Sequence, residues 1–345
     1  WGATDPTATE FTISGNNNNV NGAGSTYVAY LFAHDTATDG VIQCGSFTTD
    51  GSGNATVNLG WEPQFLIIKK SSTTGDWDML DNMRGWPVNS AQAILDANLS
   101  AAEFTSNRYP LNATGFTSFA NAASTTYIYI AIRRGPMRTP TDATKVFNAA
   151  FDYSTDTSVR GYLGAPADFA FYTRRSTSAT WNLRDRLRGS ANLWPYLTDA
   201  ESVSTTLWDN MLGFNPTGTS GTVTTDRINY VFRRAPGFFD QVCYTGTGAS
   251  NTVSHNLNAV PELLIVKPRS TTGFWRVYSA ALGNSQGLSL NATDGAYGAG
   301  TYWDTTTPTA TFFKHRPKTK GVIMRIKFFR REKATYIKLR RDHHY

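Results

Sequence analysis

The chain has 345 residues, of which 40% are hydrophobic, 13% aromatic and 17% charged. So many large apolar side chains exclude a disordered chain, and the charged fraction is below the roughly 25% of an average soluble protein. The last 32 residues hold 12 of the 32 Lys and Arg but only two of the 26 acids, which leaves −4 on the rest and +10 on the end. A basic face on every domain is therefore excluded, and nucleic acid is not expected as the main partner.

The first 26 residues resemble the end of a structural unit. Trp1 is followed by Pro6-Thr-Ala-Thr-Glu-Phe, much as Trp303 is followed by Pro308-Thr-Ala-Thr-Phe-Phe. The start carries no Met, no basic n-region and no apolar h-region, so it is not a signal peptide, and we expect the chain to begin inside a longer one. No apolar run approaches the ~18–20 residues that cross a bilayer, so no membrane partner is expected.

A strand pattern that ends in a basic pair recurs along the chain. Its marker tyrosines, Tyr27, Tyr127, Tyr230 and Tyr336, are spaced by 100, 103 and 106 residues. This interval is too long for solenoid repeats or propeller blades and equals one small domain. The sequence therefore predicts an all-β fold of tandem repeated β-sandwich-like domains of about 100 residues. The predicted parts are the end of a preceding repeat at 1–26 and β repeats at 27–126, 127–229 and 230–345.

Within the first repeat we expect strands separated by Gly, Ser, Asp and Asn turns. Cys44 and Cys243 lie in strand-like runs and are expected to be buried free thiols, since two cysteines exclude a disulfide-dense scaffold and a Cys-based zinc site. Short helices are predicted in the connecting loops near 100–103 and 198–202, where Ser or Thr can cap and an acid lies in the first turn. The predicted strands are 40–47, 54–59, 64–70, 76–81, 116–119 and 126–133.

Each repeat contains a proline, an apolar run, a basic stop, a polar turn and then a tryptophan. One Trp buries up to ~250 Å², so these residues are expected to fill the cores, with a sugar-stacking platform as the alternative. The arginine pairs 133/134 and 233/234 follow a strand, and we expect them to face solvent or to donate hydrogen bonds between domains rather than to bind an anion. The predicted core residues are Trp77, Trp181, Trp275, Tyr27, Tyr127 and Tyr230.

Motifs of catalysis are missing from the sequence. None of the five histidines recurs between repeats, and the His343-His344 pair fits a solvated terminus better than a metal site. No catalytic residue, cofactor or metal is therefore predicted. Asp76 and Asp78 share one strand face, close to Asp81, but the matching positions are Thr180, Asn182 and Asp185 in the second repeat and Phe274, Arg276 and Ser279 in the third. A carboxylate pair for glycoside hydrolysis in a single repeat remains an alternative.

The basic end, 314–345, alternates apolar and basic residues over 321–329 and keeps the closing pattern of a repeat at 335–341. We expect ordered strands that complete the third repeat and carry Lys and Arg on one face. That face should seek an acidic partner, which can be another subunit, a neighbouring structural protein or an anionic glycan, with nucleic acid as the alternative. The candidate partner-binding residues are Lys318, Lys320, Arg325, Lys327, Arg330 and Arg331.

Several long phrases, among them Tyr27-Val-Ala-Tyr-Leu-Phe-Ala-His-Asp, Gly60-Trp-Glu-Pro-Gln-Phe-Leu-Ile-Ile-Lys and Phe232-Arg-Arg-Ala-Pro-Gly-Phe-Phe-Asp, are similar to a family of repetitive proteins of tailed bacteriophages. These are described as tail or tail-fibre proteins that carry a domain of unknown function. The resemblance covers about residues 1–313 and implies a virion location with a structural or host-recognition role. It supplies no catalytic residues. After Phe313 the basic segment replaces the polar, Gly- and Asn-rich continuation of the family.

We therefore expect a non-enzymatic virion structural protein of a tail fibre or appendage, assembled in the host cytoplasm with other tail proteins. Loops at 48–55, 71–76, 154–160, 176–180, 245–252 and 270–274 are expected to meet a host-surface glycan. Homo-oligomerisation is expected, as a trimer by analogy with other fibres. One alternative is a tailspike-like depolymerase of surface polysaccharide with an acidic cleft. Another is an internal or neck protein whose basic end contacts DNA or an acidic partner.

Overall fold

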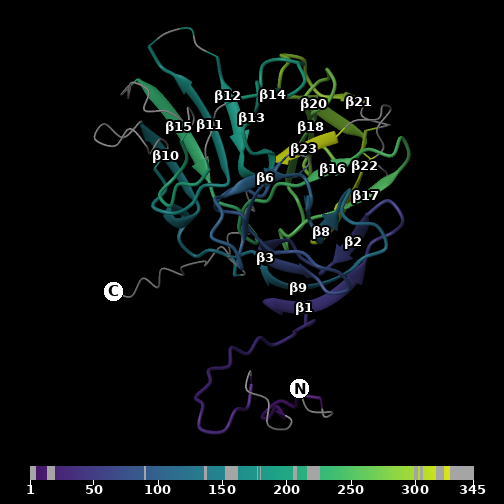
Figure 1. The fold of residues 1–345 in the computed structure, drawn as a ribbon. Helices are drawn as coiled ribbons and strands as arrows, with labels where there is room; N and C mark the ends of the chain where they lie inside the picture. Colours follow the sequence, from purple (N-terminus) through teal and green to yellow (C-terminus); the bar gives the residue numbers. More distant parts are fainter. Residues whose placement is uncertain are drawn as a thin grey trace, which may run out of the picture. The chain divides into compact units, whose positions relative to one another are not determined.

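The computed structural model describes residues 5–13, 20–88, 91–135, 138–151, 162–176, 178, 180–204, 208–215, 226–298, 302–303, 306–315 and 322–326. The chain divides into two compact units, Trp1–His34 and Asp35–Tyr345. All the strands belong to the second unit (Figure 1). The described part of the first unit contains no strand.

Three six-stranded antiparallel sheets with the same strand order build the second unit (Figure 1). In each sheet, the strand that comes last in the chain lies between the strand that comes first and the strand that comes second. The first sheet runs β1 (Ile42–Thr48), β9 (Thr126–Arg133), β3 (Pro63–Lys70), β4 (Trp77–Asp81), β5 (Gln92–Asp96) and β6 (Phe104–Ser106). The second runs β10 (Phe147–Phe151), β15 (Arg227–Phe232), β11 (Phe169–Arg174), β12 (Asn182–Asp185), β13 (Ala191–Leu193) and β14 (Ser202–Val203). The third runs β16 (Cys243–Thr245), β23 (Val322–Ile326), β18 (Leu263–Pro268), β19 (Arg276–Ser279), β20 (Gln286–Ser289) and β21 (Tyr297–Gly298).

Small sheets make the first and third repeats sandwich-like. In the first repeat, Val57 and Phe116 of the small sheet join Leu66 and Ile68 of the large sheet in one buried core. In the second repeat, loop residues such as Trp208 and Phe214 take this role. The small sheets are β2 (Ala55–Asn58), β8 (Gly115–Ser118) and β7 (Leu111–Asn112) in the first repeat and β17 (Asn251–Ser254) and β22 (Phe312–His315) in the third.

The all-β prediction is confirmed, and every strand expected in the first repeat is present with ends within two residues. The two helices predicted near 100–103 and 198–202 are not present. Among the described residues, the helical segments are two 3₁₀ turns, Ala143–Lys145 and Arg186–Arg188. The backbone near 198–202 instead bonds to the third repeat, since Gly273 N–H donates to Thr198 O at 2.7 Å and Glu201 N–H donates to Arg269 O at 2.8 Å. Tertiary hydrogen bonds have replaced the local helical ones.

The repeat boundaries lie later in the chain than the marker tyrosines suggest. Tyr127 and Tyr230 lie inside β9 and β15, the closing strands of the first and second sheets. The two tyrosines are also not structurally equivalent. Phe65 pairs with Ile132 and the matching Phe169 pairs with Phe232, so Tyr230 occupies the position that Ile130 has in the first sheet. The recurring tyrosine therefore marks the end of a repeat rather than its start.

Candidate functional site

The predicted core residues occupy very different surroundings. Trp275 and Tyr127 are 0% and 1% exposed. Trp77, Trp181 and Tyr230 are half-buried. Tyr27, in the first unit, is 48% exposed and is not a core residue of the described structure. Strand pattern places all of these residues alike, but burial depends on which neighbouring element covers each strand.

Trp275 is covered by the neighbouring repeat. Its indole N–H donates to the carbonyl oxygens of Trp194 and Leu197, each at 3.1 Å. Trp181 lacks such a cover and stacks on Phe171 of the adjacent strand with ring centroids 4.3 Å apart. The same sequence position is thus an inter-repeat anchor in one sheet and a surface aromatic pair in another.

Most of the basic candidates lie outside the described residues: Lys318, Lys320, Lys327, Arg330 and Arg331. The backbone of Arg325 belongs to β23, which pairs with β16 and β18 in the third sheet. The predicted strand at 335–341 is also outside the described range. The cysteines, expected to be buried, carry no disulfide and are half-buried.

A buried ion network joins the first two repeats where their closing strands end. Arg234 forms two hydrogen bonds to the Glu62 carboxylate, at 2.7 and 2.6 Å, and a third to Asp240 at 2.8 Å. Arg134 lies 2.5 Å from Asp168 and 3.6 Å from Glu62. The second arginine of each recurring pair is therefore an inter-repeat donor, one of the two alternatives raised by the sequence.

The arginines of this network favour the ionised form of Asp168. Burial opposes ionisation of Asp168, but the charges of Arg134, Arg186 and Arg234 hold its pKa below the usual value. Three arginines face three carboxylates in all, counting Glu62 and Asp240. The cavity beside them measures only about 30 Å³. That is room for about one water molecule, so this centre is structural.

A larger cavity of about 360 Å³ opens in the first repeat alone. Its walls are mostly polar and come from β3, β4, β5, β9 and the loops beside them. It is the candidate functional site of the described structure. The lining residues are Ile68, Lys70, Gly75, Asp76, Asp78, Asp96, Phe104, Arg108, Tyr109, Ala120, Asn121, Ala122 and Tyr127.

Two carboxyl groups of this site come from neighbouring residues on adjacent strands. Asp78 of β4 pairs with Asp96 of β5. Asp78 is 6% exposed and accepts a hydrogen bond from the Tyr109 hydroxyl at 2.9 Å, with Arg108 at 3.4 Å. Burial raises the pKa of Asp96, and a hydrogen bond to Asp78 with the charges of Asp78 and Asp76 raises that pKa further, while Arg108 opposes the rise. The surroundings of Asp96 therefore favour its protonated form more than those of an exposed aspartate do.

Other groups around the cavity are strained or unsatisfied. The Tyr127 hydroxyl and Oδ1 of Asp96 are buried and have no hydrogen-bond partner among the described residues. Burial raises the pKa of Tyr127, and the Ala122 backbone partly opposes that rise. The loop that supplies Ala120, Asn121 and Ala122 to the wall contains two non-glycine residues with positive φ, Ala120 at 50° and Ser124 at 47°. Unpaired polar atoms and strained backbone gather more often at functional sites than elsewhere.

The equivalent place in the third sheet carries the opposite chemistry. Sheet register puts Arg276 where Asp78 lies, and Ser289 where Asp96 lies. Arg276 donates to Ser289 at 3.1 Å and lies over the rings of Phe274 and Tyr302 at 4.7 and 4.5 Å. The acidic site is therefore a property of one repeat, not of the repeating scaffold.

The sequence indicated part of this site. It grouped Asp76 with Asp78, and both line the cavity. Asp81, the third member, instead pairs with Arg84 at 2.6 Å. Asp96, Arg108 and Tyr109 were missed, because they come from strands and loops that carry no motif. The sequence held one partial signal for these residues: the phrase Arg108-Tyr109-Pro110, just before β7, has no counterpart in the other repeats.

Chemically, the site can bind hydroxyl or ammonium groups through its carboxylates and can share or release a proton. Asp78 and Asp96 are neighbours on paired strands, and two neighbouring carboxyl groups are the chemistry that glycoside hydrolysis also uses. No group of three or more His, Cys, Asp or Glu side chains in the described part of the chain is arranged to hold a metal ion.

A family described only as a domain of unknown function, DUF7483, matches residues 1–136 and 217–337. These stretches cover more than half of the chain, which therefore belongs to this family. The acidic cavity lies in the first stretch, whereas β10 to β14 of the second sheet lie outside both. No curated protein and no solved structure matches the chain. None of the described segments forms a helix long and apolar enough to cross a bilayer.

Proposed function

We propose that this member of the DUF7483 family is a non-enzymatic structural protein of a bacteriophage tail fibre or appendage that attaches to a host-surface glycan. The resemblance of its long sequence phrases to repetitive tail proteins motivates the virion assignment. Its partners are then other tail proteins and further copies of the same chain. A trimer is the expected assembly, by analogy with other fibres.

The observation that carries this proposal is the joining of three like sheets into one body. Arg234 of the second repeat binds Glu62 of the first, and Arg269, next to the third sheet, binds Glu201 of the second at 2.8 and 2.7 Å. Burying such pairs between repeats resists relative motion, because separating them leaves unpaired charges. A stiff scaffold that carries a polar cavity can present a binding site to a partner.

Labelling the protein in intact particles by electron microscopy tests the virion assignment. We expect label on the tail or its appendages. Label inside the capsid or at the neck would overturn the attachment role and would favour contact with DNA or an acidic partner through the basic end. Binding to DNA would then fall steeply with rising salt.

A surface-polysaccharide hydrolase is the second candidate, favoured by Asp78 and Asp96 beside a cavity of about 360 Å³. Incubation with host surface glycans separates the two functions. Retention of the protein without new reducing ends supports attachment. Release of reducing ends that is abolished in Asp78→Asn and kept in Asp39→Asn, a change in an exposed turn, supports hydrolysis.

A further inference from the structure

We propose that the cavity of the first repeat binds one hydroxyl-rich sugar residue that is neutral or carries an ammonium group, held by Asp78, Asp96 and Tyr127. The inference deepens the proposed function and rests on it for the biological source of the sugar. The binding itself is a property of the isolated protein.

Two buried polar atoms define what the ligand must supply. Oδ1 of Asp96 is an acceptor without a donor, and the Tyr127 hydroxyl, on a side chain that is 1% exposed, has no partner among the described residues. Adjacent hydroxyls of a sugar can donate to a carboxylate and exchange a hydrogen bond with a phenol at the same time. Leaving such atoms unpaired costs free energy, so a ligand hydroxyl that reaches either atom gains a hydrogen bond there.

The size of the cavity fits a single sugar residue. About 360 Å³ lies at the lower end of the range for small-molecule sites, roughly 300–1,000 Å³. Phe104 lines one wall and offers an apolar surface to the carbon face of a sugar ring. Arg108 lies 5.6 Å from the centre of that ring, which helps to fix the wall in place.

The charge of the cavity selects against acidic sugars. Among the described residues that line the cavity, Asp76, Asp78 and Asp96 are acidic, and Lys70 and Arg108 are basic. Arg108 is already within 3.4 Å of Asp78, which leaves it less able to bind a second carboxylate. A uronate would meet like charges, whereas an amino sugar would neutralise them.

Saturation-transfer NMR and calorimetric titration with glucose, galactose, N-acetylglucosamine, glucosamine and glucuronate test the assignment on the full chain. We expect weak binding of at least one neutral or amino sugar, with the amino sugar tightest at neutral pH, and no binding of glucuronate. Failure of every neutral and amino sugar to bind, or binding of glucuronate as tight as that of glucosamine, overturns the proposal.

The variant Tyr127→Phe separates a binding role from a structural one. Because the hydroxyl is buried without a partner, we expect its removal to leave the melting temperature unchanged or higher while sugar affinity falls about tenfold. Tyr129→Phe, the same change two residues further along β9, is the matched control and should keep full affinity. Equal affinity in wild type and Tyr127→Phe overturns the site.

Asp96→Asn provides an independent check. It removes one of three crowded acids, so we expect equal or higher stability at neutral pH together with loss of the preference for glucosamine over glucose. If the variant keeps that preference, the acidic pair is not the recognition element. If both variants are retained on host glycans to the same extent as wild type, attachment uses another surface, and the attachment role stands without the cavity; failure of the sugar titrations alone overturns the cavity assignment.

Discussion

The first and second sheets carry the same Asp-x-x-Arg-Gly turn in different surroundings. Arg84 binds Asp81 at 2.6 Å and Glu103 at 3.0 Å, and these side chains are 22%, 26% and 43% exposed. Arg188 binds Asp185 at 2.5 Å and Glu201 at 3.4 Å with no exposure of the guanidinium side chain. The local motif fixes the ion triad, and the neighbouring repeat decides whether it is buried.

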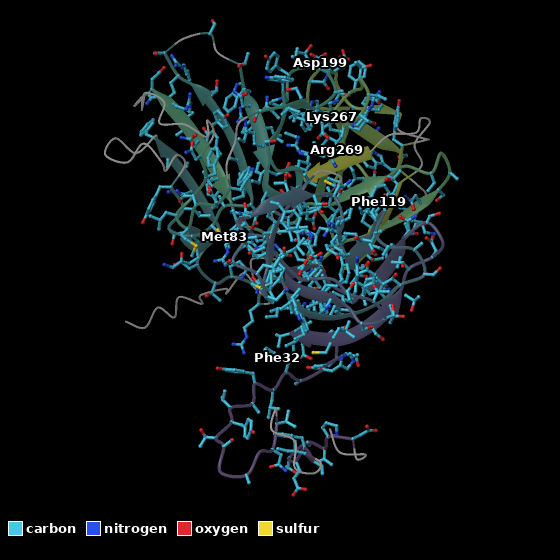
Figure 2. All side chains as sticks on the ribbon, viewed as in Figure 1. Phe32, Met83, Phe119, Asp199, Lys267 and Arg269 are labelled. Carbon is cyan, nitrogen blue, oxygen red and sulfur yellow. The ribbon has the colours of Figure 1, made fainter. Side chains whose placement is uncertain are left out.

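The third repeat supplies the burial. Arg269 donates to both carboxylate oxygens of Glu201, one of which it shares with Arg188, and Gln241 donates to Asp185 at 3.3 Å. Figure 2 shows Arg269 and Lys267 together near the end of β18. The third repeat has Ser279 and Leu282 where the other two have Asp and Arg, so no third triad of this kind can form there. The same motif therefore forms a partly exposed ion triad in the first sheet and a buried triad at an inter-repeat interface in the second.

The largest expected effect is at the network centre. Arg234→Met should lower the free energy of unfolding by about 3–5 kcal/mol, because it leaves Glu62 and Asp240 buried with less compensating charge. Urea denaturation measures the loss. Arg233→Met, one residue earlier and half-buried, should change stability by less than about 0.5 kcal/mol. Equal losses in both variants would show that the ion network does not join the repeats.

The comparison of the two triads predicts unequal costs for one substitution. Arg188→Met should cost about 3 kcal/mol, since Asp185 would remain buried without its positively charged partner. Arg84→Met should cost about 1 kcal/mol or less, because water can replace the lost partner at a half-exposed site. The two variants are each other's control in thermal unfolding. A similar cost in both would mean that burial by the third repeat carries no energetic weight.

Acid should unfold the inter-repeat contacts first. Arg234 and the other arginines hold the pKa of Asp168 and Asp240 below the usual value against burial, and Arg269 with Arg188 does the same for Glu201. Groups with a lowered folded pKa stabilise above their unfolded pKa, roughly pH 4, and lose that contribution as the pH falls through the folded pKa.

Stability against urea should therefore be flat near neutrality and fall below about pH 4. In Arg234→Met the fall should be shallower, since Asp240 no longer gains from ionisation. A wild-type stability that does not change between about pH 5 and pH 2.5 would contradict the charged state of the network.

The smallest effect concerns Lys267, which is 0% exposed and donates to Thr198 O at 3.1 Å and to Pro268 O at 2.8 Å. Burial lowers its pKa to about 8, against the opposing charges of Asp199 and Glu201. A lysine with a lowered folded pKa costs stability below that pKa, and the cost disappears as the pH rises from about 8 towards the unfolded value.

Wild type should therefore gain stability between about pH 8 and pH 10, and Lys267→Met should lack that gain. At pH 7 the variant should equal wild type or exceed it by about 1 kcal/mol, because methionine needs no hydration. Unfolding at pH 7 and pH 9.5 measures both. Strong destabilisation at pH 7 would show that the two carbonyl contacts outweigh the burial of the charge.

The strands of the first repeat follow from its sequence to within two residues, because alternation of apolar side chains and turn residues act over a few positions. The repeat period also follows from the sequence. The position of the boundaries does not, because β9 and β15 return to the inside of their own sheets, and this pairing over about 60 residues leaves no local trace.

The candidate site divides in the same way. Asp76 and Asp78 could be grouped from the sequence because strand periodicity puts alternate residues on one face. Asp96, Tyr109 and Tyr127 joined them only through sheet register and loop packing. Likewise, local sequence determined that Arg84 and Arg188 would each follow an aspartate, but the docking of the third repeat decided that only Arg188 is fully buried, since burial depends on contacts between elements far apart in the chain.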